Sequence, residues 1–287
     1  MTLTNIEKLV KRYTEYDVIQ MYTDLPAYPE LRVRLLDAYL KETGMESSRS
    51  ELFSLVTAII QMGLDAHEQV PVRNTLKTKP EARNRQLKVL AGAYFSSRYY
   101  NLLAEAGEVA AVKLLASSVS EINRLKLALY VKIKQMKVTA EEYIRQRVQI
   151  QAQLFLSFAE LIPDYARKTL TDLIYGVSRF EVLAGELDRL REDQAAIESW
   201  GFWHVHDMGS RDERKQLAAG ASDPSRLKAL LLKYKAGQQL QHLLEEEAGH
   251  ICRKLREVNS ERLLEELRPL TERLSRAMGK ARILEER

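Results

Sequence analysis

Hydrophobic residues recur at steps of three and four along most of the chain. This period is that of an amphipathic α-helix, and we find no sustained alternation of period two bounded by turn residues, which would indicate strands. The pattern therefore predicts an all-α protein built as a large helical bundle.

Local signals predict where several helices begin. Ser48 and Glu51 have the spacing of a capping box, which predicts a helix over 49–70, and Thr139 and Glu142 repeat it. Asp223 followed by Pro224 predicts another helix start. The 49–70 segment is apolar around most of its circumference, so we expect it to lie at the centre of the bundle.

The C-terminal part of the chain has a different pattern. Residues 200–223 show the weakest helical pattern, and we expect a loop there. Beyond it a one-sided apolar stripe predicts a helix that packs through one face; its members are Leu240, Leu244, Ala248, Ile251, Leu255 and Val258. Pro269 should bend or break the helix that follows. We expect one domain over 1–287, with a main bundle at 1–222 and additional charged helices at 223–287.

Composition narrows the class of protein. The 287 residues include only 12 Gly and 7 Pro, which argues against a disordered or fibrous chain, and 45% hydrophobic residues can form a sizeable core. Basic and acidic residues, 44 and 40, are interleaved rather than gathered in the basic stripe of a nucleic-acid binder. The single Cys252 cannot form an intramolecular disulfide, and no apolar run approaches the roughly 18 residues of a membrane span. We expect a cytoplasmic protein.

The segment 62–103 carries the most informative chemistry. The enclosed helix should end with Asp65, His67 and Glu68, and a basic stretch follows in which Glu81 is the one acid. The basic residues are Arg73, Lys77, Lys79, Arg83, Arg85 and Lys88. Acids facing a basic loop are what a site for a metal and a diphosphate needs, but a solvated helix end beside a charged surface loop gives the same pattern. Spacing alone favours the second interpretation.

Two strings in this segment resemble the trans-polyprenyl diphosphate synthases, and more closely the small subunit of bacterial two-component heptaprenyl diphosphate synthase. They are LDAHEQV at 64–70 and RNRQLKVLAGAYFSSRYYNLL at 83–103. The catalytic family carries an H-D-D-x-x-D-type motif, then L-R-R, then A-V-L-x-G-D-Y-L. The first motif matches His67, Glu68, Gln69 and Val72; the second matches Leu76, Lys77 and Thr78; the third matches Val89, Leu90, Gly92, Ala93 and Tyr94. The resemblance implies a bundle of the isoprenoid synthase type in which most charged catalytic positions have been replaced.

The second aspartate-rich motif of the family, F-Q-x-x-D-D-x-x-D, matches FEVLAGELD at 180–188. Phe180 and Asp188 agree with it, whereas Ala184 and Gly185 stand at the two leading aspartates. Prenyl transfer needs divalent cations to neutralise the departing diphosphate, and Mg²⁺ is held mainly through carboxylate oxygens. We therefore expect no catalytic residue, no bound metal and no independent catalysis in this chain.

The resemblance implies a partner and a role. We expect a non-catalytic regulatory subunit that pairs with a catalytic large subunit, as a heterodimer or a larger complex. That partner would bind Mg²⁺ and extend farnesyl diphosphate with isopentenyl diphosphate toward the menaquinone side chain. Candidate diphosphate contacts are Lys77, Arg83 and Arg85; candidate interface residues, which could equally be core, are Leu87, Leu90, Gly92, Tyr94 and Phe95.

Two other functions stay open at this stage. One is a divergent active prenyltransferase with an improvised metal site, and the other is a helical interaction protein unrelated to prenyl transfer. The improvised site would consist of Asp65, Glu68, Asp188 and Glu192.

Three further features are weaker candidates. His204, His206 and Asp207 could ligate a metal, although an expected loop and a lack of nearby cysteines argue against zinc. The aromatic residues beside them are expected to anchor the loop. Basic neighbours could lower the pKa of Cys252, but nothing assigns it a catalytic role.

Overall fold

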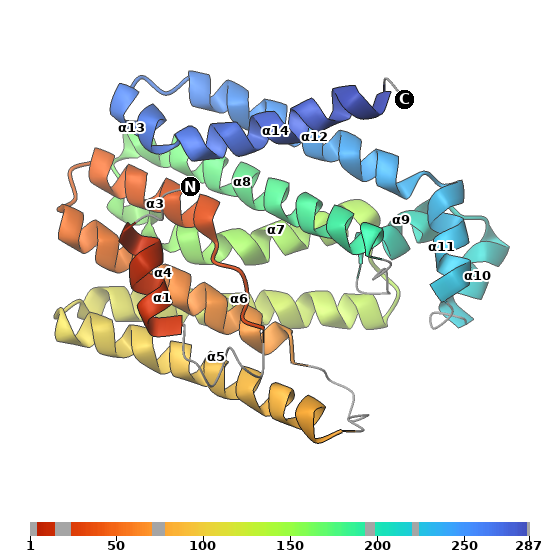
Figure 1. Cartoon of the computed structure of the whole chain (residues 1–287), viewed down its shortest axis with the longest axis horizontal. Helices are drawn as coiled ribbons and strands as arrows, with labels where there is room; N and C mark the ends of the chain where they lie inside the picture. Colours follow the sequence, from red (N-terminus) through yellow and green to blue (C-terminus); the bar gives the residue numbers. More distant parts are fainter. Residues whose placement is uncertain (1–4, 15–23, 71–77, 193–198, 220–223, 286–287) are drawn as a thin grey trace. The chain divides into compact units, whose positions relative to one another are not determined.

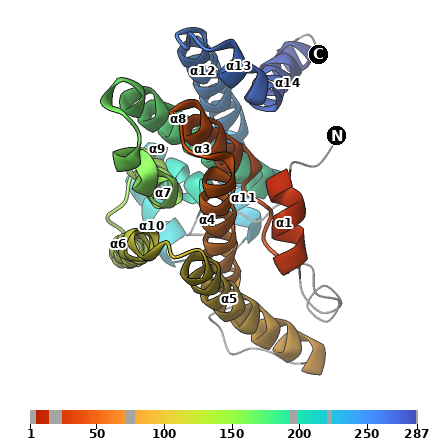
Figure 2. The ribbon, with the colours of Figure 1, turned by 90° about the vertical axis from the view of Figure 1, so that its left-hand side faces the viewer.

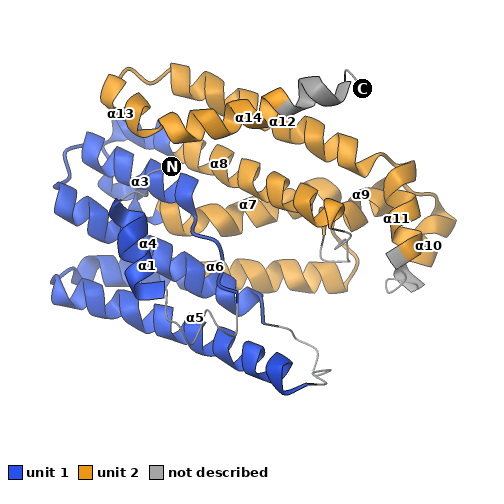
Figure 3. Ribbon diagram, in the orientation of Figure 1, with its two compact units in different colours: residues 1–119, 157–170 blue, residues 120–156, 171–287 orange. Residues whose placement is uncertain are grey.

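The computed structural model describes residues 5–14, 24–70, 78–192, 199–219 and 224–285. Within these ranges every regular element is helical, so the all-α prediction is confirmed (Figure 1). The described residues form two compact units that interleave along the chain (Figure 3): residues 1–119 with 157–170, and residues 120–156 with 171–287. A boundary near residue 222 stays a prediction.

Unit 1 is built around α4. Its elements are α1 (Asn5–Thr14), α3 (Glu30–Glu42), α4 (Ser47–Glu68), α5 (Lys79–Glu105), the first part of α6 (Val109–Lys134), the short helix η1 (Ser157–Leu161) and the start of α8 (Asp164–Arg191). α4 contacts α1, α3 and α5, and its long apolar run is almost wholly buried. The expectation that this helix is central is therefore confirmed within its unit.

α4 and α5 form an antiparallel pair and pack against each other; they run side by side in Figure 1, and in Figure 2 α5 slants away from the lower end of α4. Arg49 at the start of α4 bonds to Glu108 just beyond α5, with Nε 2.6 Å from the carboxylate. At the other end the helices cross through Gly63 and Gly92, both buried. A Cβ at Gly63 would lie 3.2 Å from Cβ of Phe95, so glycine permits the close approach here.

Unit 2 comprises the remaining parts of α6 and α8 together with later helices. They are α7 (Ala140–Leu156), α9 (Trp200–Met208), α10 (Arg211–Ala219), α11 (Pro224–Lys233), α12 (Ala236–Arg256), α13 (Glu261–Glu266) and α14 (Arg268–Glu285). α12 buries five of the six predicted stripe residues and packs on α14. The start of α11 at Pro224 is as predicted, and Pro269 lies in the first turn of α14, directly after a break from α13.

The prediction of a loop at 200–223 is wrong for residues 200–219, which the structure describes, because α9 and α10 lie there. Ser199 caps α9, its hydroxyl accepting the Phe202 N–H at 3.4 Å. Trp200, Phe202 and Trp203 are buried. Cap and apolar burial together stabilise a nine-residue helix that would be marginal alone.

The predicted capping box at Ser48 is also wrong. α4 begins two residues earlier than the expected residue 49, at Ser47, and the Ser48 hydroxyl donates to Glu46 at 2.7 Å. Glu51 instead accepts a hydrogen bond from Asn5 Nδ2 at 3.0 Å. Of the capping box predicted at 139–142, one hydrogen bond forms: Thr139 Oγ1 accepts the Glu142 N–H at 3.1 Å. The Glu142 carboxylate binds Lys132 instead of the helix end.

Candidate functional site

The first degenerate region occupies the C-terminal turn of α4 in unit 1. Asp65 is half-buried, and its Oδ1 accepts a hydrogen bond from Gln61 Nε2 at 2.9 Å. His67, Glu68 and Gln69 are exposed, and the Gln69 N–H closes the helix on the Asp65 carbonyl at 3.1 Å. Val72 lies outside the described residues. The helix thus ends with Asp65, His67 and Glu68, as the sequence predicts.

His67 lies directly on the backbone of Gly92 in α5. A Cβ built at residue 92 would be 2.5 Å from Nε2 of His67 and 2.6 Å from its Cε1, which is far inside contact distance. The imidazole can therefore occupy this place only because residue 92 has no side chain. The group that approaches Gly92 is thus a side chain of the first degenerate region.

The basic residues begin α5. Thr78 and Glu81 form a capping box, in which Thr78 Oγ1 accepts the Glu81 N–H at 3.4 Å and Glu81 accepts the Thr78 N–H at 3.0 Å. Glu81 is thereby committed to the helix end. Arg83 is exposed and Arg85 half-buried on the turns that follow, whereas Lys77 lies outside the described residues. Their role as diphosphate contacts stays a prediction.

The second degenerate region lies on α8 in unit 2. Phe180 is buried, while Asp188 is 66% exposed and pairs with Arg191 at 3.3 Å. Open space surrounds Gly185, since a Cβ there would meet nothing within 4 Å.

The acid in this region that sequence reasoning missed is Glu186, which is only 4% exposed. Its carboxylate accepts the Trp200 N–H at 2.7 Å and the Tyr143 hydroxyl at 3.1 Å, so it joins α8 to α7 and to the first turn of α9. Burial, followed by the Glu186 charge, raises the pKa of Tyr143 above its ordinary value. The pattern could not reveal this role because both partners are distant in sequence.

The five candidate interface residues differ in exposure. Gly92 and Phe95 are buried inside unit 1, and Leu87 and Tyr94 are half-buried. Leu90 is 62% exposed. Two other apolar residues of α5, Val89 at 42% and Tyr100 at 45%, are also exposed, although neither was among the candidates. Exposed apolar side chains on one helix are a signature of a binding surface when they lie on one face.

The histidine and aspartate side chains of α9 point to separate partners. His204 Nε2 lies 3.1 Å from the Tyr234 carbonyl, and Asp207 caps α7 by accepting the Ala140 N–H at 2.7 Å. Across the described part of the chain no three His, Cys, Asp or Glu residues cluster closely enough to hold a metal ion. The expected anchoring role of the α9 aromatic residues agrees with their burial.

Burial raises the pKa of the Cys252 thiol. The expectation that basic neighbours lower this pKa is therefore wrong. A raised pKa leaves less reactive thiolate.

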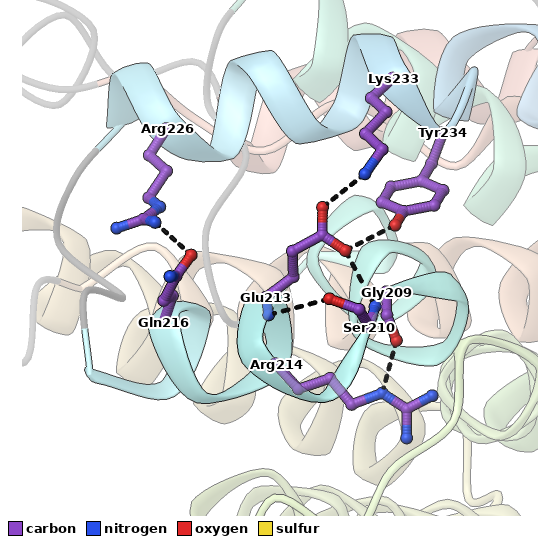
Figure 4. A network of polar contacts seen from close by, with 8 residues as sticks. All are labelled: Gly209, Ser210, Glu213, Arg214, Gln216, Arg226, Lys233 and Tyr234. Carbon is purple, nitrogen blue, oxygen red and sulfur yellow. Dashed lines mark hydrogen bonds and ion pairs between the residues drawn. The ribbon is translucent and has the colours of Figure 1, made fainter.

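A polar network around Glu213 joins α10 to α11 (Figure 4). The Glu213 carboxylate accepts bonds from Lys233 Nζ at 2.7 Å, the Tyr234 hydroxyl at 2.7 Å and the Ser210 N–H at 2.9 Å. These donors lower its pKa to about 2. Arg226 and Gln216 form a second bond between the same helices. The S-x-x-E spacing of Ser210 and Glu213 was a sequence signal for this helix start.

Comparison with known proteins identifies the family. The family model of heptaprenyl diphosphate synthase subunit 1 matches residues 16–200. Heptaprenyl diphosphate synthase component 1 of Geobacillus stearothermophilus is 38% identical over 85 residues, which are 30% of this chain and 36% of that protein. The match therefore spans about a third of this relative.

Solved structures show the fold. The decaprenyl diphosphate synthase of Rhodobacter capsulatus is similar with a TM-score of 0.69 at 14% identity, over 96% of this chain and 94% of that one. The polyprenyl synthase of Caulobacter crescentus, solved with calcium and isoprenyl diphosphate, gives 0.68 at 16% identity, over 95% and 93%. In the described ranges no helix is long and apolar enough to cross a membrane. The chain belongs to the heptaprenyl diphosphate synthase subunit 1 family and has the polyprenyl synthase fold.

Proposed function

We propose that this chain is the non-catalytic, regulatory subunit of a heteromeric heptaprenyl diphosphate synthase. A separate catalytic subunit carries the carboxylates that bind Mg²⁺ and extends farnesyl diphosphate with isopentenyl diphosphate for the menaquinone side chain. This chain stabilises that partner and helps to set product length. The proposal rests on family membership and on the state of the two degenerate regions.

The observation that carries the proposal is that three acids of the two degenerate regions are bonded within the protein. Asp65 accepts a bond from Gln61, Asp188 pairs with Arg191, and Glu186 is buried against α7 and α9. Magnesium in prenyl transfer needs several carboxylates turned toward a diphosphate. Acids already bonded to protein donors, beside Ala184 and Gly185, do not supply such a set.

A surface on α5 fits the catalytic partner. The exposed positions of α5 between residues 86 and 104 recur every three or four residues, singly or as adjacent pairs, and include no charged residue; they are Gln86, Val89, Leu90, Ala93, Ser96, Ser97, Tyr100, Asn101 and Ala104. We call them the α5 stripe. A depletion of charge with exposed aliphatic and aromatic side chains is typical of the core of a protein interface. The family is described as one subunit of a synthase, which makes the other subunit the occupant we propose.

The activity test compares this chain alone, the catalytic partner alone and their mixture. Each receives farnesyl diphosphate, labelled isopentenyl diphosphate and Mg²⁺, and product is counted by chain length. We expect heptaprenyl product from the mixture and none from this chain alone. Robust elongation by this chain without the partner would refute the proposal.

The surface test uses Leu90→Glu, which places a charge in the middle of the α5 stripe. The matched control is Leu232→Glu on α11, where the leucine is 74% exposed. We expect the first variant to weaken association with the catalytic subunit at least tenfold, because an unpaired charge is costly to desolvate in an interface. The control should bind like the unmodified chain.

A divergent active enzyme is the competing function. It would use Asp65, Glu68, Asp188 and Glu192 as metal ligands, so Glu68→Ala and Asp188→Ala would abolish turnover of the reconstituted complex. We expect both variants to retain turnover within twofold. A helical protein unrelated to prenyl transfer is disfavoured by the family match.

A further inference from the structure

The contact between His67 and Gly92 differs in kind from the helix crossing beside it. A Cβ at Gly63 would press on Cβ of Phe95 at 3.2 Å and on the Gly92 carbonyl at 3.4 Å, which belong to a buried helix face and cannot move independently. A Cβ at Gly92 would instead meet the imidazole of His67, an exposed side chain with two rotatable bonds. Gly63 thus fixes the distance between the helices, whereas Gly92 fixes the place of one side chain.

That place is the edge of the α5 stripe. Gly92 lies three residues after Val89 and four residues before Ser96, both stripe members, so the three positions adjoin on the helix surface. The Ser96 hydroxyl donates to the Gly92 carbonyl at 2.9 Å, which commits both groups to this contact. The imidazole of His67 covers the backbone at this edge and remains exposed to solvent.

We propose that His67 is a residue of the partner-binding surface, and that Gly92 is the positioning residue that seats it there. This inference rests on the proposed function and extends the docking surface from α5 onto the end of α4. A side chain held in place before association loses less conformational entropy when a partner binds it. An imidazole offers both a flat ring and a hydrogen-bonding nitrogen to the facing subunit. The residue that matches the histidine of the catalytic motif is here a binding residue.

The test is a double-mutant cycle on association with the purified catalytic subunit. The variants are His67→Ala, Gly92→Ala and both together, with Kd measured by calorimetry and the thermal midpoint of each isolated chain measured by circular dichroism. We expect each single change to raise Kd about fivefold, as for an interface residue worth about 1 kcal/mol. The double variant should be no weaker than either single one, because Gly92→Ala acts only by displacing His67.

Gln69→Ala is the matched control. Residue 69 is the C-cap that directly follows α4, two positions beyond His67 and about 200° further around the helix axis, and it is also exposed. It should bind within twofold of the unmodified chain. If Gly92→Ala lowers the thermal midpoint, the Kd of His67→Ala alone still tests the role of His67, since truncating an exposed side chain leaves the fold intact.

A Kd within twofold of the unmodified value for His67→Ala would overturn the inference, as would single effects that multiply in the double variant. Leu90→Glu separates this failure from that of the proposed function. If Leu90→Glu weakens binding and His67→Ala does not, only the role of His67 is wrong. If Leu90→Glu binds normally, the α5 stripe is not the docking surface and both proposals fail.

Discussion

Truncating Glu186 tests whether the second degenerate region has become a structural element. Glu186→Ala removes the acceptor of two buried donors, the Tyr143 hydroxyl and the Trp200 N–H. A buried polar group left unpaired costs about 1 to 3 kcal/mol, so the two together predict a loss of about 2 to 6 kcal/mol in the free energy of unfolding. Glu186→Gln keeps one acceptor oxygen and should lose about 1 to 2 kcal/mol.

The assay is equilibrium urea denaturation at pH 7. The two tryptophans of the chain are Trp200 and Trp203, both in α9, so their fluorescence reports on the helix that Glu186 holds, and far-ultraviolet circular dichroism reports on the whole chain. The control is Asp188→Asn, an exposed acid on the same helix, which should change stability by about 0.5 kcal/mol or less. A loss for Glu186→Ala no larger than that for Asp188→Asn would refute the structural role.

Three further predictions concern individual contacts. The lowered pKa of Glu213, about 2 against an ordinary 4.5, stabilises the folded state above pH 4.5, and this contribution is lost as pH falls toward 2. Glu213→Gln should therefore unfold more easily than the unmodified chain at pH 7 and equally easily at pH 2, in urea titrations across that range. Gly176→Ala should lower the free energy of unfolding by about 1 to 3 kcal/mol, because its Cβ would lie 3.0 Å from Cγ1 of Ile251. Gly185→Ala on the same helix should raise it by up to about 1 kcal/mol, because a Cβ there meets nothing within 4 Å. Thermal unfolding of both variants tests the two predictions. Thr78→Ala should lose about 1 kcal/mol with the capping box of α5, and an unchanged thermal midpoint would contradict it.

Periodicity predicted the long helices well because burial of a continuous apolar face decides them. α4 spans Ser47–Glu68 against the expected 49–70, and α12 buries five of the six residues of the predicted stripe. α9 was missed because its start depends on Ser199 and on Glu186, a residue of another helix that accepts its first N–H. The buried residues of this nine-residue helix crowd into its first six positions, and so short a segment shows no period of 3.6; they are Trp200, Gly201, Phe202, Trp203 and Val205.

Side-chain partners were the least predictable part of the site. The pattern placed Glu51 in a cap and Cys252 beside charges that would lower its pKa. In the folded chain Glu51 accepts a hydrogen bond from Asn5, and burial raises the pKa of the Cys252 thiol. Likewise, the sequence placed Leu90 and Phe95 on one candidate surface, but they lie five residues apart and therefore on opposite sides of α5, one exposed and one buried. Rotation of a helix about its axis follows from packing, which here is set by the crossing at Gly63.

The glycines at 92 and 185 differ in what they do for the fold. Gly92 agrees with the glycine of the family motif, and a side chain there would displace the imidazole of His67. The requirement at residue 92 therefore comes from the place of His67. Gly185 is not required, since a side chain there meets nothing within 4 Å, and glycine inside a helix costs about 1 kcal/mol relative to alanine. An aspartate at 185 would therefore fit the scaffold, and its absence confers no stability. A carboxylate is absent where packing leaves room for one. This agrees with the proposal that the catalytic subunit, and not this chain, binds the cation.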